Sequence, residues 1–344
     1  MQYFTGSYII TILGVILAWF WGEHIHHGTG LLSVFIVLVL GLLEVSLSFD
    51  NAVVNAMKLE KMNEKWRGRF LTWGIAIAVF GMRFLFPVLV VAIFAQISLL
   101  EVTKIAFTDS LKYAHYLHQT HAPIVAFGGT FLMMLFFSYF FNNEKEVHWI
   151  KYIEKSLQYF GNIKGTETLI TLFALFIVQP HVQTEQRLFV VLSGISGIII
   201  YLLVDGITKW LEGKEEESTK QFATTIKSSG IVGFLYLELI DASFSLDGVL
   251  GAFALSKDIL IITIGLAIGA MFVRSLTIML VEKKTLNKYL YLEHGAHWAI
   301  GALSVIMLIS SFHEVPEVLT GLIGLVFILL ALVSSLIHNK KSNS

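Results

Sequence analysis

The sequence has no cysteine and few charged residues. Without Cys, the chain cannot form disulfides, thiolate metal sites or a catalytic thiol. Only 14% of its 344 residues are charged, whereas about 25% are charged in a typical soluble domain. The net charge is -1 and there is no exposed basic domain, so nucleic acid is not an expected partner. These absences exclude thiol chemistry and argue against a soluble fold.

Long hydrophobic runs dominate the composition instead. Hydrophobic residues make up 56% of the chain, and the mean hydropathy is +0.74. Runs of about 20 apolar residues, the length that crosses a bilayer as a helix, recur along the whole sequence. The sequence therefore predicts an all-α polytopic membrane protein, a single domain over residues 1–344 whose surroundings are the lipid bilayer. Ten spans are predicted, at about 7–22, 31–57, 70–95, 123–141, 166–180, 187–207, 229–255, 259–281, 295–312 and 317–337.

Basic residues alternate between the loops. With the N-terminus in the cytoplasm, most of the 24 Lys and Arg residues fall in inside loops or the C-terminal tail, and few fall in outside loops. Cytoplasmic loops of membrane proteins carry this excess of basic residues. The pattern predicts that both termini are cytoplasmic, in a bacterial cytoplasmic (inner) membrane. The first apolar run has no basic region before it and no A-x-A-like site after it, so it is predicted to be retained.

A short polar motif occurs twice within the apolar runs. The segment EVSLSFDN begins at Glu44, and the segment DASFSLDG begins at Asp241. Four positions match in register: Glu44 with Asp241, Ser46 with Ser243, Ser48 with Ser245, and Asp50 with Asp247. Two later matches pair Arg83 with Arg274 and His121 with His294. Matches in this order predict an internal duplication.

The motifs lie in the second and seventh predicted spans, which cross the membrane in opposite directions. The duplication is therefore predicted to be an inverted repeat of two five-helix units, residues 7–180 and residues 187–337. Transporters built from inverted repeats bind their substrate near the middle of the membrane, where the repeats meet.

Carboxylates are concentrated in the two motif spans. The candidate cation ligands are Glu44, Asp50, Asn51, Glu238, Asp241 and Asp247. An ionised carboxylate inside a bilayer is costly unless it is paired, solvated or protonated. Oxygen ligands without Cys select hard divalent cations such as Mg²⁺, Ca²⁺ and Mn²⁺. The cluster is interpreted as a cation site, and the alternative is a structural network neutralised by arginines.

Other polar residues have predicted supporting roles. Four serines supply polar groups beside the acids: Ser46, Ser48, Ser243 and Ser245. Arg83 and Arg274 are predicted to balance charge inside the membrane. His121 and His294 recur in the repeat, which suggests a gate or proton relay, with a structural role at a helix end as the alternative. Close carboxylates titrate together, so coupling to protons is an open expectation.

The spacing of the acids limits how one ion is bound. Glu44 and Asp50 are six residues apart, about 9 Å along a straight helix and about 120° around it. Oxygen ligands lie only about 2.0–2.6 Å from Mg²⁺ or Ca²⁺, so a straight helix cannot present both carboxylates to one ion. Either the helix unwinds near residues 48–51 and at the matching positions of the second copy, or both repeats supply ligands. The second solution is favoured, with Glu44 facing Asp247 and Asp50 facing Asp241.

The paired acid-Ser-Ser-Asp motifs, each followed by Gly-Ile/Leu-Ala and an Arg, resemble the TerC family of integral membrane proteins, named for tellurium resistance. The resemblance covers about residues 30–312 and extends to the LysE-type transporter superfamily. It implies manganese export. It carries over five positions as metal-site residues: Glu44, Asp50, Asn51, Asp241 and Asp247. The second copy has Gly where the first has Asn51, so the two halves are not equivalent.

These observations predict a secondary transporter of a divalent metal cation, with Mn²⁺ export favoured over transport of Ca²⁺ or Mg²⁺. The alternative is a non-transporting membrane scaffold or a metal-delivery partner for secretory machinery. Enzymatic activity is not expected, and no catalytic residue is predicted. An intramembrane aspartyl protease would need Gly-x-Gly-Asp, whereas Asp247 follows Phe-Ser-Leu. The sequence specifies no oligomeric state.

Overall fold

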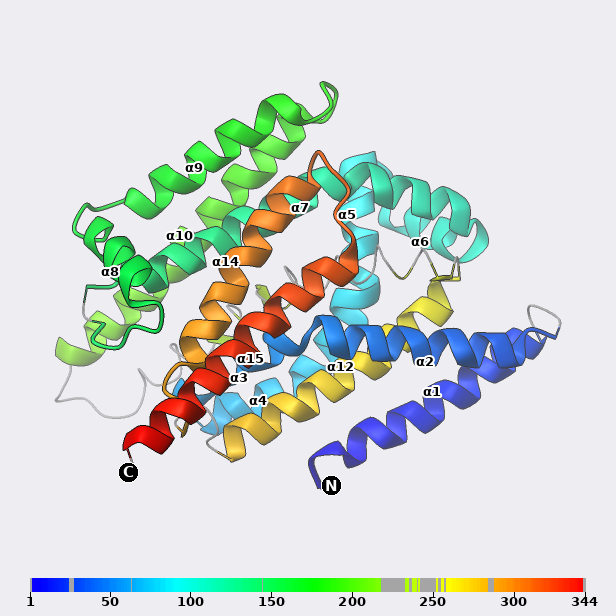
Figure 1. Cartoon of the computed structure of the whole chain (residues 1–344). Coiled ribbons are helices and arrows are strands. Elements are labelled where there is room, and N and C mark those ends of the chain that lie inside the picture. The colour runs from blue at the N-terminus through cyan, green and yellow to red at the C-terminus, as the bar shows by residue number, and fades with distance from the viewer. Residues whose placement is uncertain are drawn as a thin grey trace.

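The computed structural model describes residues 2–24, 28–62, 64–143, 145–217, 258–283 and 288–342, and residues 233, 234, 237–239, 241, 252, 255 and 256. Most of these residues are helical, and Figure 1 shows the helices packed as a bundle. The helices of the first half are α1 (Thr5–His24), α2 (Gly30–Leu47), α3 (Phe49–Lys61), α4 (Glu64–Ala76), η2 (Ile77–Leu85), α5 (Phe86–Ala95), α6 (Leu99–Thr108), α7 (Ser110–Phe140), α8 (Lys151–Phe160) and α9 (Thr166–Val178). The remaining long helices are α10 (Arg187–Glu217), α12 (Ile259–Glu282), α14 (Leu292–Ser310) and α15 (Glu317–Ser342). Two single 3-10 turns, η1 (Gln2–Phe4) and η3 (Gln179–His181), complete the described elements.

Six of the described helices are long and apolar enough to cross a membrane. They are α1, α7, α10, α12, α14 and α15, which correspond to the first, fourth, sixth, eighth, ninth and tenth predicted spans. A helix satisfies all of its own backbone polar groups, which is the condition for crossing lipid. The protein is therefore an all-α polytopic membrane protein, as the sequence predicts. α2 and α3 form a seventh candidate, because together they pass the same criteria across a bend of 53°.

By helix length and composition, the other three predicted spans are not among the candidates for crossing the membrane in the described part of the chain. The span predicted at 70–95 consists of α4, η2 and α5, with a π-helix in its middle. The span predicted at 166–180 is α9, whose 13 residues fall short of the roughly 20 that cross a bilayer. The span predicted at 229–255 falls mostly outside the described residues. The count of ten spans and the inverted repeat therefore stay predictions.

The spanning helices divide into inner and outer members. In α7, α12 and α14, between 67% and 78% of the apolar window is buried inside the protein. In α1, α10 and α15 the buried share is only 22% to 28%, although these helices are as apolar as the inner ones. An apolar surface of this extent is rare on soluble monomers. The outer helices therefore present their apolar side chains to lipid.

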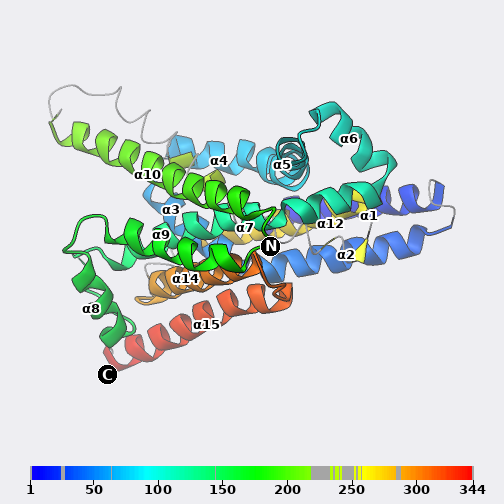
Figure 2. The same ribbon diagram turned by 90° about the horizontal axis from the view of Figure 1, so that it is seen from above.

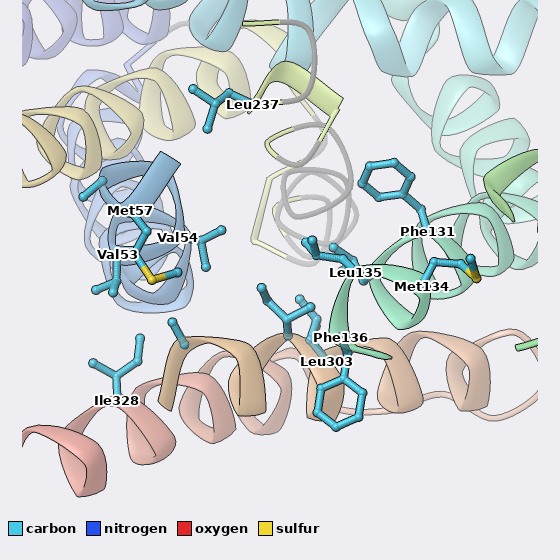
Figure 3. Packing of buried hydrophobic residues seen from close by; sticks show 14 of the residues in the cluster. Val53, Val54, Met57, Phe131, Met134, Leu135, Phe136, Leu237, Leu303 and Ile328 are labelled. Carbon is cyan, nitrogen blue, oxygen red and sulfur yellow. The ribbon is translucent and has the colours of Figure 1, made fainter. Parts of the chain in front are cut away.

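α3 lies in the core, packed against α7, α14 and α15. Figure 3 shows Val53, Val54 and Met57 of α3 in one apolar cluster with residues of α7, α14 and α15. α7 also packs along α10 and α14, and α12 packs along α2, an arrangement visible in Figures 1 and 2. Because α3 begins within the first acid motif and carries its Asp50 and Asn51, this packing fixes the position of that motif.

α2 and α12 approach closely because glycines line their interface. A Cβ added to Gly269 would lie 2.4 Å from Cβ of Glu44 and 2.8 Å from the carbonyl oxygen of Gly41. A Cβ added to Gly265 would lie 2.6 Å from Cβ of Leu40. In membranes, small residues let helix backbones approach one another in this way. The contact brings α12 directly against Glu44.

Gly269→Ala is expected to destabilise the protein, because the new methyl group would collide with Glu44 and with the backbone of Gly41. Overpacking of this kind costs about 1–3 kcal/mol. Thermal unfolding in detergent micelles measures the effect. Gly68→Ala is the matched control, since no atom lies within 4 Å of a Cβ at that position of α4. An equal unfolding temperature for the two variants would contradict the close α2–α12 contact.

Candidate cation site

A break in the helix positions the first acid motif. Ser48 joins α2 to α3 with φ −105° and ψ 18°, and the helix direction changes by 53°. The Ser48 hydroxyl donates to Glu44 Oε1 at 3.1 Å. The N–H of Asn51 donates to Asp50 Oδ1 at 2.9 Å, a local side-chain bond of the kind that competes with regular helix. The helix thus breaks at Ser48, while Asn51 already lies inside α3.

Asp50 occupies the first turn of α3, where the helix dipole favours a negative charge. Its side chain is buried, with 4% exposure. A Cβ added to Gly324 would lie 2.4 Å from Asp50 Oδ2, so this carboxylate packs directly against α15. The absence of a side chain at Gly324 makes room for it.

Arg83 reaches the acids from a π-helix. η2 is a π-helix within a predicted span, and such turns are frequent at functional sites. Nη2 of Arg83 donates to Glu44 Oε1, and Nη1 lies 4.0 Å from Asp241 Oδ2. The side chains of Arg83 and Glu44 are each only 2% exposed. Arg83 therefore bridges an acid of the first motif and an acid of the second.

The two motif copies meet directly at Asn51 and Asp241. Nδ2 of Asn51 donates to Asp241 Oδ1 at 2.6 Å. The sequence reasoning set Asp50 opposite Asp241, whereas in the structure its neighbour Asn51 makes this contact. Adjacent residues point about 100° apart around a helix, and Asp50 faces α15 instead. Three predicted site residues, Ser243, Ser245 and Asp247, lie outside the described residues.

A cavity of about 30 Å³ lies beside these groups. It is lined by Asn55, Phe70, Gly74, Arg83, Glu238, Asp241, Ala270, Val273, Arg274 and Thr277. Glu238 and Arg274 converge on Gly74, where an added Cβ would lie 3.2 Å from Glu238 Oε1 and 3.4 Å from Arg274 Nη1. Arg274 is held by the carbonyl oxygen of Phe70, which accepts from its Nη2. The cavity has room for one water molecule or one dehydrated cation.

Several polar atoms around this cavity have no hydrogen-bond partner among the residues that the structure describes. They are Asn55 Oδ1, Glu238 Oε1, Asp241 Oδ2 and Arg274 Nε. Leaving a buried polar atom without a partner costs about 1–3 kcal/mol. Three of the four atoms are oxygens, the ligands of hard cations. Their chemistry therefore suits a cation that enters the cavity.

Acids outnumber bases in the described part of the site. Four acids, Glu44, Asp50, Glu238 and Asp241, are buried together with two arginines, Arg83 and Arg274. If all the acids are ionised, the site carries two excess negative charges, which is the charge that one divalent cation neutralises. Among the described residues, however, no three His, Asp or Glu side chains converge closely enough to hold a metal ion. The described conformation is one in which an arginine lies between the acids.

Ser46 does not belong to this cluster. Its side chain is exposed, and its hydroxyl donates to the carbonyl oxygen of Leu42 in its own helix. The prediction that Ser46 supports the site is wrong for this conformation, because two residues along a helix correspond to about 200° of rotation away from Glu44. Ser48, four residues from Glu44, is the serine that contacts the acid.

The two repeated histidines have different surroundings. His121 is half-buried on α7, and His294 is buried on α14. Neither histidine lines the cavity. Nδ1 of His294 lies 2.9 Å from Glu154 Oε2 of α8. A gate or relay role for these histidines therefore stays a prediction.

Glu154 is the centre of a second buried polar cluster, which sequence reasoning missed. Trp298 Nε1 donates to it at 3.0 Å, and the N–H groups of Trp149 and Ile150 donate at 2.9 and 3.3 Å. Burial raises the pKa of Glu154, but the hydrogen bonds from His294 and Trp298 and the proximity of His294 outweigh it and lower the pKa to about 2. In the sequence an acid between lysines resembles a solvated surface residue, so no pattern distinguished it.

Comparison with known proteins identifies a family without assigning an activity. A family model described as "Protein of unknown function (DUF475)" matches residues 49–342. The chain is also 30% identical over 137 residues to "Uncharacterized membrane protein YceF" of Bacillus subtilis (strain 168). That match covers 38% of this chain and 52% of the relative, so the chain spans about half the length of the curated relative. No solved structure matches the chain. The name of the relative agrees with a membrane protein, and the resemblance to TerC stays a prediction.

Proposed function

The chain belongs to DUF475, a family of proteins of unknown function, and from this premise we propose that it is a secondary transporter of a divalent metal cation. The observation that carries the proposal is the buried cluster of acids and arginines at the break between α2 and α3. Ionisable residues inside a membrane are costly and usually mark an ion pathway. Broken helices supply ion sites in known transporters. A structural network would be as stable with apolar side chains in place of these groups.

Ligand chemistry supports the choice of cation. The described site offers carboxylate and amide oxygens, and the chain has no Cys, so Mn²⁺, Mg²⁺ and Ca²⁺ fit better than soft metals. With all four described acids ionised, the two excess negative charges of the site match one divalent ion. The resemblance to TerC favours Mn²⁺ export as the activity. The basic inside loops favour both termini in the cytoplasm, and the similarity to a Bacillus subtilis membrane protein favours a bacterial cytoplasmic membrane.

Arg83 is the internal counter-ion in the proposed cycle. In the described conformation it bridges Glu44 and Asp241, so these acids are paired without a metal. A divalent cation that enters the cavity competes for the same oxygens, and Arg83 has to withdraw from Glu44 for the acids to bind it. When the metal cation replaces the guanidinium of Arg83 beside these acids, the net buried charge stays small, which limits the desolvation cost. Protonation of one acid would also keep the buried charge small. It would couple transport to protons.

Flux through purified protein in liposomes tests the proposal. Mn²⁺, Ca²⁺ and Mg²⁺ are supplied outside the vesicles, and a metal indicator and a pH dye are enclosed inside. We expect protein-dependent Mn²⁺ entry, with a pH change if protons are coupled. Folded protein that moves none of the three ions would reject the transporter and favour the alternative, a membrane scaffold or metal-delivery partner for secretory machinery.

A further inference from the structure

α8 lies outside the spanning helices and runs in a different direction. Figure 2 shows it lying across the direction of α9, α14 and α15, at the end of the bundle that carries the C-terminus. The basic-loop pattern predicts that this end is cytoplasmic. A helix oriented across the spans at the end of a bundle has the geometry of a helix in the membrane interface.

One face of α8 is hydrogen-bonded to α14 and to the segment that precedes α8. Glu154 is only 2% exposed and is bonded to His294 and Trp298 of α14. Nε2 of Gln158 donates to the carbonyl oxygens of Asn143 at 3.0 Å and Lys145 at 3.1 Å. These contacts fix which side of α8 faces outward.

The opposite face is apolar and exposed, and its Phe160 ring lies 6.4 Å, centroid to centroid, from the ring of Phe141 at the end of α7. Its exposed side chains are Tyr152 at 90%, Ile153 at 50%, Tyr159 at 73% and Phe160 at 47%. At 100° per residue these side chains, with Ser156 among them, fill a single arc opposite Glu154. Tyrosine and other aromatic residues are enriched where the bilayer meets water.

Lysines flank this apolar arc. Lys151 and Lys155 lie between the outer arc and the buried Glu154, and Lys164 follows in the turn to α9. All three lysines are exposed, and the described residues offer them no ion-pair partner. α9, which comes next, carries exposed Phe173 and Phe176. The outer face of α8 is therefore followed along the chain by a helix with exposed aromatic side chains, and the three lysines add positive charge beside it.

We propose that α8 is an in-plane membrane anchor that binds anionic phospholipid headgroups through Lys151, Lys155 and Lys164. The tyrosines and the apolar side chains of the arc insert at the level of the headgroups, while Glu154 holds the helix to α14. The charge of the three lysines selects anionic over zwitterionic lipid, since each basic residue near an anionic surface strengthens binding. This inference does not depend on the proposed transport activity.

A single fluorescent label tests the anchor in the full chain. The native sequence has no Cys, so Ser156→Cys introduces a unique thiol on the outer face of α8. The thiol is labelled with an environment-sensitive dye, and the protein is reconstituted in phosphatidylcholine vesicles with and without phosphatidylglycerol. We expect nitroxide-labelled headgroups to quench the dye, and the quenching to increase with phosphatidylglycerol.

Titration of the labelled protein in neutral detergent with phosphatidylglycerol gives the contribution of the lysines. The variant Lys151→Gln/Lys155→Gln/Lys164→Gln is expected to bind phosphatidylglycerol about 100-fold more weakly, since each lysine contributes about fivefold. The control variant Lys104→Gln/Lys112→Gln removes exposed lysines of α6 and α7 and should titrate like the parent. A triple variant that titrates like the parent overturns the proposal. A dye that stays in water in every vesicle also overturns it and would make the arc a protein-docking face.

Discussion

Asp241→Asn is expected to lower the initial rate of Mn²⁺ flux in proteoliposomes by about 100-fold or more. Asp241 joins the two motif copies, because one oxygen accepts from Asn51 and the other lies 4.0 Å from Arg83 at the cavity. The substitution keeps the volume of the side chain and removes one of the four described negative charges. Losing an outer partner of a metal site costs 10–100-fold, so losing a ligand should cost at least the upper value.

Two further variants separate a loss of ligand from a loss of structure. Glu101→Gln removes an exposed acid of α6 and should leave flux unchanged. Gly324→Ala changes no charge, but its methyl group would displace Asp50 Oδ2 and is expected to lower flux. If folded Asp241→Asn and Gly324→Ala proteins both transport Mn²⁺ at the parent rate, the acids at the α2–α3 break do not bind the transported ion.

Arg83→Met is expected to destabilise the protein by about 3–5 kcal/mol, the range measured when one partner of a buried ion pair is removed. Glu44 and Asp241 would then be buried without their common counter-ion. Chemical denaturation in detergent micelles measures the change in the free energy of unfolding. Arg69→Met removes an exposed arginine of α4 and should change that free energy by no more than about 0.5 kcal/mol.

A double variant tests the physical cause of this loss. Arg83→Met combined with Glu44→Gln is expected to recover part of the lost stability, because neutralising both partners removes the unpaired charge. Recovery should be incomplete, since Asp241 stays charged, and Asn51 is its one hydrogen-bond donor among the described residues. Equal stability of Arg83→Met and the Arg69→Met control would contradict the bridging role of Arg83.

The spanning helices were predictable because the bilayer leaves the chain few choices. An apolar run of about 20 residues in lipid has to satisfy its own backbone, and a helix is the local way to do so. Six predicted spans match helices that meet the length and composition criteria. The run at 70–95 is different, since a π-helix interrupts it and carries Arg83 into the site. The hydrophobicity of the sequence does not distinguish a π-helix from an α-helix, so it does not predict this feature.

The acids were identifiable because charge inside an apolar run is costly and therefore conspicuous. Repetition of the motif added Arg83 and Arg274 to the candidates, and the structure buries both arginines beside acids. Glu154 was missed for the opposite reason, since an acid flanked by lysines on a short segment looks solvated. Only the docking of α8 on α14 buries it against His294 and Trp298.

The sequence by itself determined the class of the protein, most of its spans, and the oxygen chemistry of the candidate site. Tertiary structure alone decided which side chains meet. It turned Ser46 outward and Asp50 toward Gly324, and it set Asn51 against Asp241. These outcomes depend on a 53° bend and a π-turn, which rotate whole helices relative to one another. A rotation of one residue, about 100°, is enough to exchange one partner for another, and no pattern in the sequence specifies it.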